Sequence, residues 1–187
     1  INTPVVDISS GGVAIADTTI TYATVNDSSL SWTAIYTVNS SDTDGTVTFG
    51  IDASSVLTAT DATQATQANI TSGSNVTIDT TSPTFTTVDI SSNNPIDASF
   101  AKVSNTVTLN MVASEIITTP TIVLNIGGSS VSHNGVTGSG NSYSITYTVQ
   151  SGDNGAFGFT IDASDNAGNN AVQATSTTNS TSVTADN

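Results

Sequence analysis

Apolar residues alternate with hydroxyl and amide residues through much of the second half of the chain. The alternation is regular at residues 107–113 (VTLNMVA) and 143–149 (YSITYTV), so each segment has one apolar face and one polar face. This period of two residues is typical of a β-strand with one side in the core. No window shows sustained helical periodicity, and no apolar run approaches the roughly 18 residues of a membrane-spanning helix. The pattern predicts an all-β protein with no membrane insertion in this segment.

Seven short strands are predicted from residue 85 onward, separated by turns rich in Gly, Asn and Ser. Seven strands in about 105 residues, without helices, predict a two-sheet Ig-like β-sandwich. The chain lacks the Cys pair of antibody domains, and its one Trp, Trp32, aligns with Tyr143, which indicates an ordinary core aromatic. The predicted strands cover residues 85–90, 106–114, 121–126, a short piece near 131, 142–149, 156–163 and a piece near 180–185.

The same pattern occurs twice. The run PVVDISSGG at residues 4–12 aligns with PTIVLNIGG at 120–128, and YTVNSSD at 36–42 aligns with YTVQSGD at 147–153. FGIDAS at 49–54 likewise aligns with FTIDAS at 159–164. The spacing stays near 110 residues, about the size of one small all-β domain. The repeat predicts tandem Ig-like β-sandwiches.

The first copy has no counterpart of residues 83–115, because Ile1 aligns near Ile117. We therefore expect residues 1–81 to form an Ig-like repeat that lacks its first strands, and residues 82–187 to form a complete one. Either the chain is an excerpt of a longer array, or its first sandwich is completed by a strand from another molecule. The excerpt is favoured because more than one strand is missing.

Composition and charge narrow the range of partners. Ser and Thr make up roughly a third of the residues, far above ordinary usage. The chain has 15 acidic residues and one basic residue, Lys102, and its formal net charge is -14. Phosphate binding needs clustered Lys and Arg, so nucleic acid is a poor partner and so is an anionic membrane surface. A cation is the natural counterpart of this chain.

Several motifs of the second copy carry a family resemblance. These are DTTSPTF at residues 79–85, AKVSNTVTL at 101–109, ASE at 113–115 and DASDNAGN at 162–169. The chain resembles the bacterial and archaeal Ig-like repeats of large cell-surface proteins. The resemblance implies a structural role in adhesins, surface-layer proteins or extracellular fibres, outside the cell or on its surface. The first copy departs from it, because SSVL at 54–57 replaces the acidic and Gly-containing stretch.

The acidic residues gather in particular loops. In an Ig-like sandwich, the segment before the first strand and the loops after the second and sixth strands meet at one pole. Carboxylates that converge without a base repel one another unless a cation is bound, and Ca²⁺ accepts six to eight such oxygens. The alternative is that Asp and Asn serve as turn residues that bond their own backbone. The candidate calcium ligands are Asp79, Glu115, Asp162, Asp165 and Asn166, with Asp42 and Asp44 from the first copy.

Catalysis is not expected. His133 is the only histidine and lies in a Ser-rich turn, and no nucleophile elbow, phosphate loop or paired-His metal motif occurs. A carbohydrate-binding or adhesive module is the main alternative function. Such a site needs exposed aromatic residues, and only 5% of the residues are aromatic. Most of these fall on the core phase of strands, and Tyr22 and Phe100 are the exceptions.

The sequence thus predicts a structural module of a long repetitive extracellular or cell-surface protein, whose beads pack into a rod or lattice. Its expected partners are other copies of itself or neighbouring repeats. Glycans are further candidates, because an Asn-Xaa-Ser/Thr acceptor motif occurs five times. The motifs start at Asn26, Asn39, Asn69, Asn75 and Asn179.

Overall fold

The computed structural model describes residues 5–15, 20–25, 28–52 and 73–187. The chain divides into two compact units, Ile1–Thr81 and Ser82–Asn187, which are called unit 1 and unit 2 below. All regular elements of the described residues are β-strands, and these residues contain no helix able to cross a bilayer.

One sheet of unit 2 has four strands in the order β12-β13-β9-β7, and every neighbouring pair is antiparallel. The long strands β9 and β13 pair over seven residue positions. A register shift near the start of β7 interrupts its pairing with β9. The strands are β7 (Phe85–Ser92), β9 (Thr106–Ala113), β12 (Thr137–Ser139) and β13 (Ser142–Thr148).

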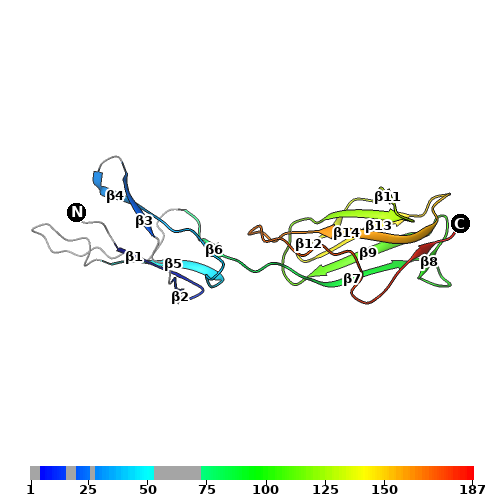
Figure 1. The fold of residues 1–187 in the computed structure, drawn as a ribbon, viewed down its shortest axis with the longest axis horizontal. Helices are drawn as coiled ribbons and strands as arrows, with labels where there is room; N and C mark the ends of the chain where they lie inside the picture. The colour runs from blue at the N-terminus through cyan, green and yellow to red at the C-terminus, as the bar shows by residue number, and fades with distance from the viewer. Residues whose placement is uncertain (1–4, 16–19, 26–27, 53–72) are drawn as a thin grey trace, which may run out of the picture. The chain divides into compact units, whose positions relative to one another are not determined.

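The second sheet of unit 2 has five strands in the order β11-β10-β14-β15-β8 (Figure 1). Its pairs are antiparallel except at one edge, where β8 lies parallel to β15. The strands are β8 (Phe100–Ala101), β10 (Thr121–Ile126), β11 (Ser129–Val131), β14 (Gly155–Asp162) and β15 (Thr184–Ala185).

This strand order is that of an Ig-like sandwich. In an Ig-like sandwich of seven strands, the first, second, fifth and fourth strands in chain order form one sheet, and the third, sixth and seventh form the other. Here β7, β9, β13 and β12 make the first group, and β10, β14 and β15 make the second. The predicted all-β, Ig-like fold class is therefore confirmed.

The core of unit 2 follows from the alternation of its strands. In β9 every second side chain is buried, and the residues between them are only partly covered. The same alternation occurs in β10 and β13. The inward side chains of both sheets form one cluster, whose most deeply buried large members are Val88, Leu109, Met111, Leu124, Ile145, Val149, Ile161 and Val183.

Two strands of unit 2 were not predicted, so the expected count of seven was too low. The extra strands are β8 and β12, which have two and three residues. All three side chains of β12 are exposed, so it carries no alternation that a sequence pattern could reveal. The last strand is also shorter than expected, because only Thr184 and Ala185 of the predicted 180–185 pair in the sheet.

The described strands of unit 1 form two sheets. One has the order β2-β1-β5-β6 and the other contains β3 and β4, and neither includes a strand of unit 2. The strands are β1 (Val5–Ser10), β2 (Val13–Ala14), β3 (Thr21–Val25), β4 (Ser28–Ile35), β5 (Gly45–Asp52) and β6 (Thr77–Ile78).

The larger sheet of unit 1 repeats the second sheet of unit 2. The order β2-β1-β5-β6 matches β11-β10-β14-β15 strand for strand. The register also matches, because Ile8 pairs with Phe49 as Leu124 pairs with Phe159. The sequence repeat is therefore a structural repeat with the same hydrogen-bonded partners.

Candidate metal centre

Three of the acids predicted as calcium ligands come together in the structure. Asp79, Glu115 and Asp165 each offer a carboxylate oxygen, and the three oxygens lie within 4.8 Å of one another. Asp79 follows β6 in the segment that leads into unit 2, Glu115 lies two residues beyond β9, and Asp165 lies three residues beyond β14. These residues are called the acidic cluster below.

Asp165 is the anchor of this cluster. Its side chain is only 3% exposed. One carboxylate oxygen accepts hydrogen bonds from the backbone N–H groups of Gly168 at 2.7 Å and Asn169 at 2.9 Å. The other oxygen accepts the Asn169 side-chain amide at 2.8 Å. The loop is thereby wrapped around the carboxylate, and Gly168 takes the positive φ of 97° that the turn requires.

The hydrogen bonds keep Asp165 ionised. Burial alone would raise the pKa of its carboxyl group. The bonds from the Asn169 side chain, and then from the backbone N–H groups of Asn169, Gly168 and Ala167, outweigh burial and hold that pKa below its usual value. A buried carboxylate that stays charged is a suitable ligand for a hard cation.

The electrostatics of the acidic cluster favour a cation. Asp79 and Glu115 are both partly buried, so their mutual repulsion and that of Asp165 is screened less than it would be in open water. The only basic side chain of the chain, Lys102, is exposed in the turn after β8 and belongs to none of the segments that build the cluster. The donor set is entirely oxygen, as Ca²⁺ or Mg²⁺ prefers.

Asp162 and Asn166 lie near the cluster in sequence but outside the group of three. Asp162 is the exposed last residue of β14, and both its oxygens accept hydrogen bonds from the Gln173 side-chain amide at 2.9 Å. It lines a shallow polar depression together with Thr118, Ser164 and other residues. Asn166 is exposed in the loop that Asp165 organises.

The Asp42 carboxylate forms hydrogen bonds with residues of unit 1. Both its oxygens accept the Tyr36 hydroxyl at 2.8 Å, and one also accepts the Asn39 backbone N–H at 3.0 Å. These bonds fix the turn that precedes β5. The side chain therefore has the local role of a turn residue, which is the alternative that the sequence left open.

Asp44 also acts within unit 1. It accepts the Thr81 hydroxyl at 2.6 Å, and the Thr80 backbone N–H and hydroxyl at 2.7 and 2.9 Å. These bonds, that of the Thr81 hydroxyl first, hold the pKa of Asp44 below its usual value. Asp44 thereby ties the end of unit 1 to the turn before β5. Neither Asp42 nor Asp44 belongs to the acidic cluster.

The sequence analysis did not predict one hydrogen-bonded pair of side chains. Tyr147 donates its hydroxyl proton to Asp153 at 2.8 Å, as Tyr36 does to Asp42 in unit 1. Burial and this contact with Asp153 raise the pKa of Tyr147 to about 12. The signal was present in the repeat, since a Tyr precedes an Asp by six residues in both copies.

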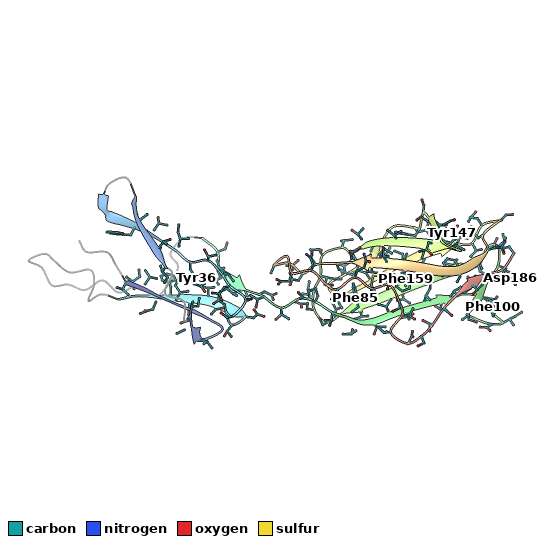
Figure 2. All side chains as sticks on the ribbon, viewed as in Figure 1. Tyr36, Phe85, Phe100, Tyr147, Phe159 and Asp186 are labelled. Carbon is teal, nitrogen blue, oxygen red and sulfur yellow. The ribbon has the colours of Figure 1, made fainter. Side chains whose placement is uncertain are left out.

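The other candidate groups are placed as follows. His133 contacts two backbone carbonyl oxygens, those of Asn134 at 2.5 Å and Ile122 at 3.2 Å. Phe100 is 47% exposed, and the side chain of Tyr22 lies outside the described residues. Figure 2 shows Phe100 and Asp186 at the end of unit 2 where the chain ends. The remaining aromatic residues of unit 2 are buried in the core or packed against it: Phe85, Tyr143, Tyr147, Phe157 and Phe159.

The glycan acceptor motifs differ in accessibility. Asn75 and Asn179 are exposed, and Asn39 is half-buried. The side-chain amide of Asn39 donates to the Tyr36 hydroxyl at 3.1 Å, so a glycan there would displace that bond. Asn26 and Asn69 lie outside the described residues.

Comparisons with known proteins add little to this picture. No family model matches the chain. No curated protein matches it either. A solved structure described as "Anomalous substructure of Titin-A168169" covers 98% of this chain and 83% of its own, at 14% identity and a TM-score of 0.32. A match at that score carries no argument, so the fold assignment rests on the strand order and register given above.

Proposed function

We propose that this chain is a non-catalytic structural module of a long repetitive extracellular or cell-surface protein. Its Ig-like beads would pack end to end into a surface layer, an adhesin stalk or a filament. The observation that carries the proposal is the structural repeat, in which the same four strands pair in the same order and register in both units. Repeat proteins use such units to build extended assemblies from one kind of contact.

The way in which the chain leaves each unit supports this proposal. Ile78 pairs with Gly45 at the end of unit 1, and Ala185 pairs with Gly155 at the end of unit 2. Two residues after each of these positions, a backbone N–H donates to the residue that precedes the paired Gly. The donors are Thr80 to Asp44 at 2.7 Å and Asn187 to Asn154 at 3.1 Å.

This match makes Asp186 the counterpart of Asp79. Each follows the last paired strand residue of its unit directly, and each stands before the N–H donor that closes the unit. Unit 2 thus carries an acid after its last paired strand residue at the position where unit 1 carries Asp79. A head-to-tail array of one kind of repeat requires the same residues at the end of each repeat.

We propose further that the acidic cluster binds calcium. The three carboxylates of Asp79, Glu115 and Asp165 supply oxygens of the kind that Ca²⁺ needs, and waters or backbone carbonyls would complete a shell of six to eight. Bound calcium would relieve the repulsion among the three carboxylates.

Calorimetric titration with CaCl₂ tests the calcium proposal. We expect one binding event per chain, and a rise in the melting temperature of unit 2 that chelator reverses, because a ligand of the folded state stabilises it by mass action. Glu115→Gln should weaken binding at least tenfold, since it removes one charged ligand. The matched control is Asp97→Asn, an exposed acid whose carboxylate serves only its own turn through Ser99.

The result that would overturn the calcium proposal is equally plain. The calcium proposal fails if millimolar calcium produces no heat of binding and no change in melting temperature. The acids would then be turn residues. The same conclusion follows if Glu115→Gln and Asp97→Asn weaken calcium binding equally. The structural role would then rest on the repeat alone, and scattering from a chain with more repeats would test it without calcium.

A further inference from the structure

The sequence contains two Asn-Gly dipeptides, Asn134–Gly135 and Asn154–Gly155, and both lie in unit 2. Asn is a chemically labile residue, because the backbone nitrogen that follows it can attack its side-chain carbonyl carbon. A following Gly leaves that nitrogen most accessible, since it has no Cβ to shield it or to restrict the backbone. The structure places the two dipeptides in different surroundings, so their reactivity should differ.

Asn154–Gly155 is held on both sides. Gly155 is the first residue of β14 and pairs with Ala185. Its φ is 112°, and a Cβ there would lie 2.9 Å from the Gly127 Cα, so the backbone is closely packed at this point. The side-chain oxygen of Asn154 accepts the Asn187 backbone N–H at 3.1 Å. Attack by the Gly155 nitrogen would have to disrupt the pairing and move the packed backbone.

Asn134–Gly135 lies in an open loop. Residues 132–136 belong to no strand, and Asn134 and Gly135 are both exposed. Apart from its chain neighbours, nothing lies within 4 Å of a Cβ placed on Gly135. Among the described residues, none accepts a hydrogen bond from the Gly135 backbone N–H. The Gly135 nitrogen is therefore free to approach the Asn134 side chain.

The neighbours of Asn134 favour this attack. The Asn134 backbone N–H and side-chain amide donate to the carbonyl oxygen and the hydroxyl of Thr146, each at 2.9 Å, and so hold the residue against β13. The ring nitrogen Nδ1 of His133 contacts the Asn134 backbone carbonyl oxygen. That oxygen and the Gly135 N–H belong to one peptide group. A proton on Nδ1 therefore stabilises the negative charge that forms when this group is deprotonated.

We propose that Asn134 is a site of spontaneous deamidation, at which the Gly135 nitrogen closes a succinimide ring and His133 assists. The Gly135 N–H first loses its proton to water or hydroxide. Its nitrogen then forms a bond to Cγ of Asn134, the Cγ–Nδ2 bond breaks, and Nδ2 takes up a proton from water and leaves as ammonia. A second water opens the ring at either of its carbonyl carbons, which yields aspartate or isoaspartate. No atom changes its oxidation state.

The modification changes the loop in two ways. The amide that donates to Thr146 is lost, and a carboxylate takes its place in a chain whose formal net charge is already -14. Isoaspartate also lengthens the main chain by a methylene group between Val131 and Val136, which both pack against the core. The inference does not depend on the proposed function.

Peptide mass spectrometry of the full folded chain, incubated for several days near neutral pH, tests the proposal. Chymotrypsin cleaves after Leu and aromatic residues, so Asn134 and Asn154 fall in separate peptides, 125–143 and 148–157. We expect Asn134 to deamidate at least about ten times faster than Asn154, which corresponds to a difference of about 1.4 kcal/mol in the barrier. In urea, which removes the constraints of the fold, the two rates should become similar.

Two variants test the parts played by Gly135 and His133. Gly135→Ala places a Cβ in open space, so it keeps the fold and should slow deamidation of Asn134 by about tenfold. His133→Ala removes the contact with the Asn134 carbonyl oxygen and should slow the same reaction by about threefold. The rate at Asn154 is the control for folding in each variant, because it rises if unit 2 unfolds.

Equal rates at Asn134 and Asn154 in the folded chain would overturn the proposal, and so would an unchanged rate at Asn134 in Gly135→Ala. An unchanged rate in His133→Ala would overturn the assistance by His133. Calcium binding and the repeat architecture are measured separately, so this inference can fail without them.

Discussion

Replacement of Asp165 by Ala should destabilise unit 2 even when no metal is present. The substitution removes the acceptor of the hydrogen bonds at 2.7, 2.9 and 2.8 Å, and of the bond from the Ala167 backbone N–H, which together hold the loop up to Asn169. A bond to a charged group contributes about 1.5–3 kcal/mol. Water can replace part of this at an exposed loop, so we expect a loss of about 2–4 kcal/mol in the free energy of unfolding.

Differential scanning calorimetry of the full chain in chelator measures this effect. For a domain of this size the loss corresponds to a fall of roughly 8–20 °C in the melting temperature of unit 2. Asp165→Asn keeps one acceptor oxygen for the backbone N–H groups and should lose about half as much. The control is Asp162→Asn, because Asp162 is exposed and bonds only the Gln173 side chain, so its loss should stay within about 0.5 kcal/mol.

The reasoning fails if Asp165→Ala melts within about 2 °C of the unaltered chain in chelator. The loop would then hold its shape through Ile117, which forms an isolated β-bridge with position 165 through the backbone. An equal loss in the Ala and Asn variants would also contradict it, since the amide retains an acceptor.

Three further predictions concern unit 2. Tyr147 has its pKa raised from 10.0 to about 12, so the stability it contributes is complete below about pH 10 and is lost as the pH rises toward 12. The Tyr147→Phe variant also lacks the bond to Asp153, and its free energy of unfolding in urea should fall less steeply between pH 9 and 12. The same pH dependence in the variant and the unaltered chain would contradict this. Leu109→Ala should lower the free energy of unfolding by about 2–5 kcal/mol in urea, against less than about 1 kcal/mol for the half-exposed Val123→Ala. Gly138 has a φ of 127°, and a Cβ there would lie 2.3 Å from a backbone oxygen. Gly138→Ala should therefore lower the free energy of unfolding by at least about 1–3 kcal/mol. An unchanged free energy of unfolding would mean that the turn at β12 is not constrained.

Strands that bury one face could be predicted from the sequence. β10 occupies residues 121–126 as expected, and β9 ends one residue before the predicted limit, because both carry a full alternation of core and surface residues. The strands β8 and β12 could not be predicted. Each is too short to show a period, and each pairs only because a neighbouring strand places a backbone edge beside it.

Part of the candidate site could be predicted from the sequence, and part could not. That Asp79, Glu115 and Asp165 come together follows from the order of the loops in an Ig-like fold, which the strand pattern was enough to predict. The roles of Asp42 and Asp44 depend on local hydrogen bonds in a turn and at a chain exit. A charge pattern records how many acids a loop holds, and it carries no information on the direction in which each side chain points.

Electron cryo-tomography of the native assembly tests the central claim, that this chain is a bead of a repetitive structure, most directly. The chain has no Cys, and Val172 is 87% exposed, so Val172→Cys provides one site for a gold label on each copy. The account predicts gold particles that recur at one regular spacing along rods or across a lattice outside the cell. Gold particles scattered on separate molecules, with no repeated spacing, would contradict it.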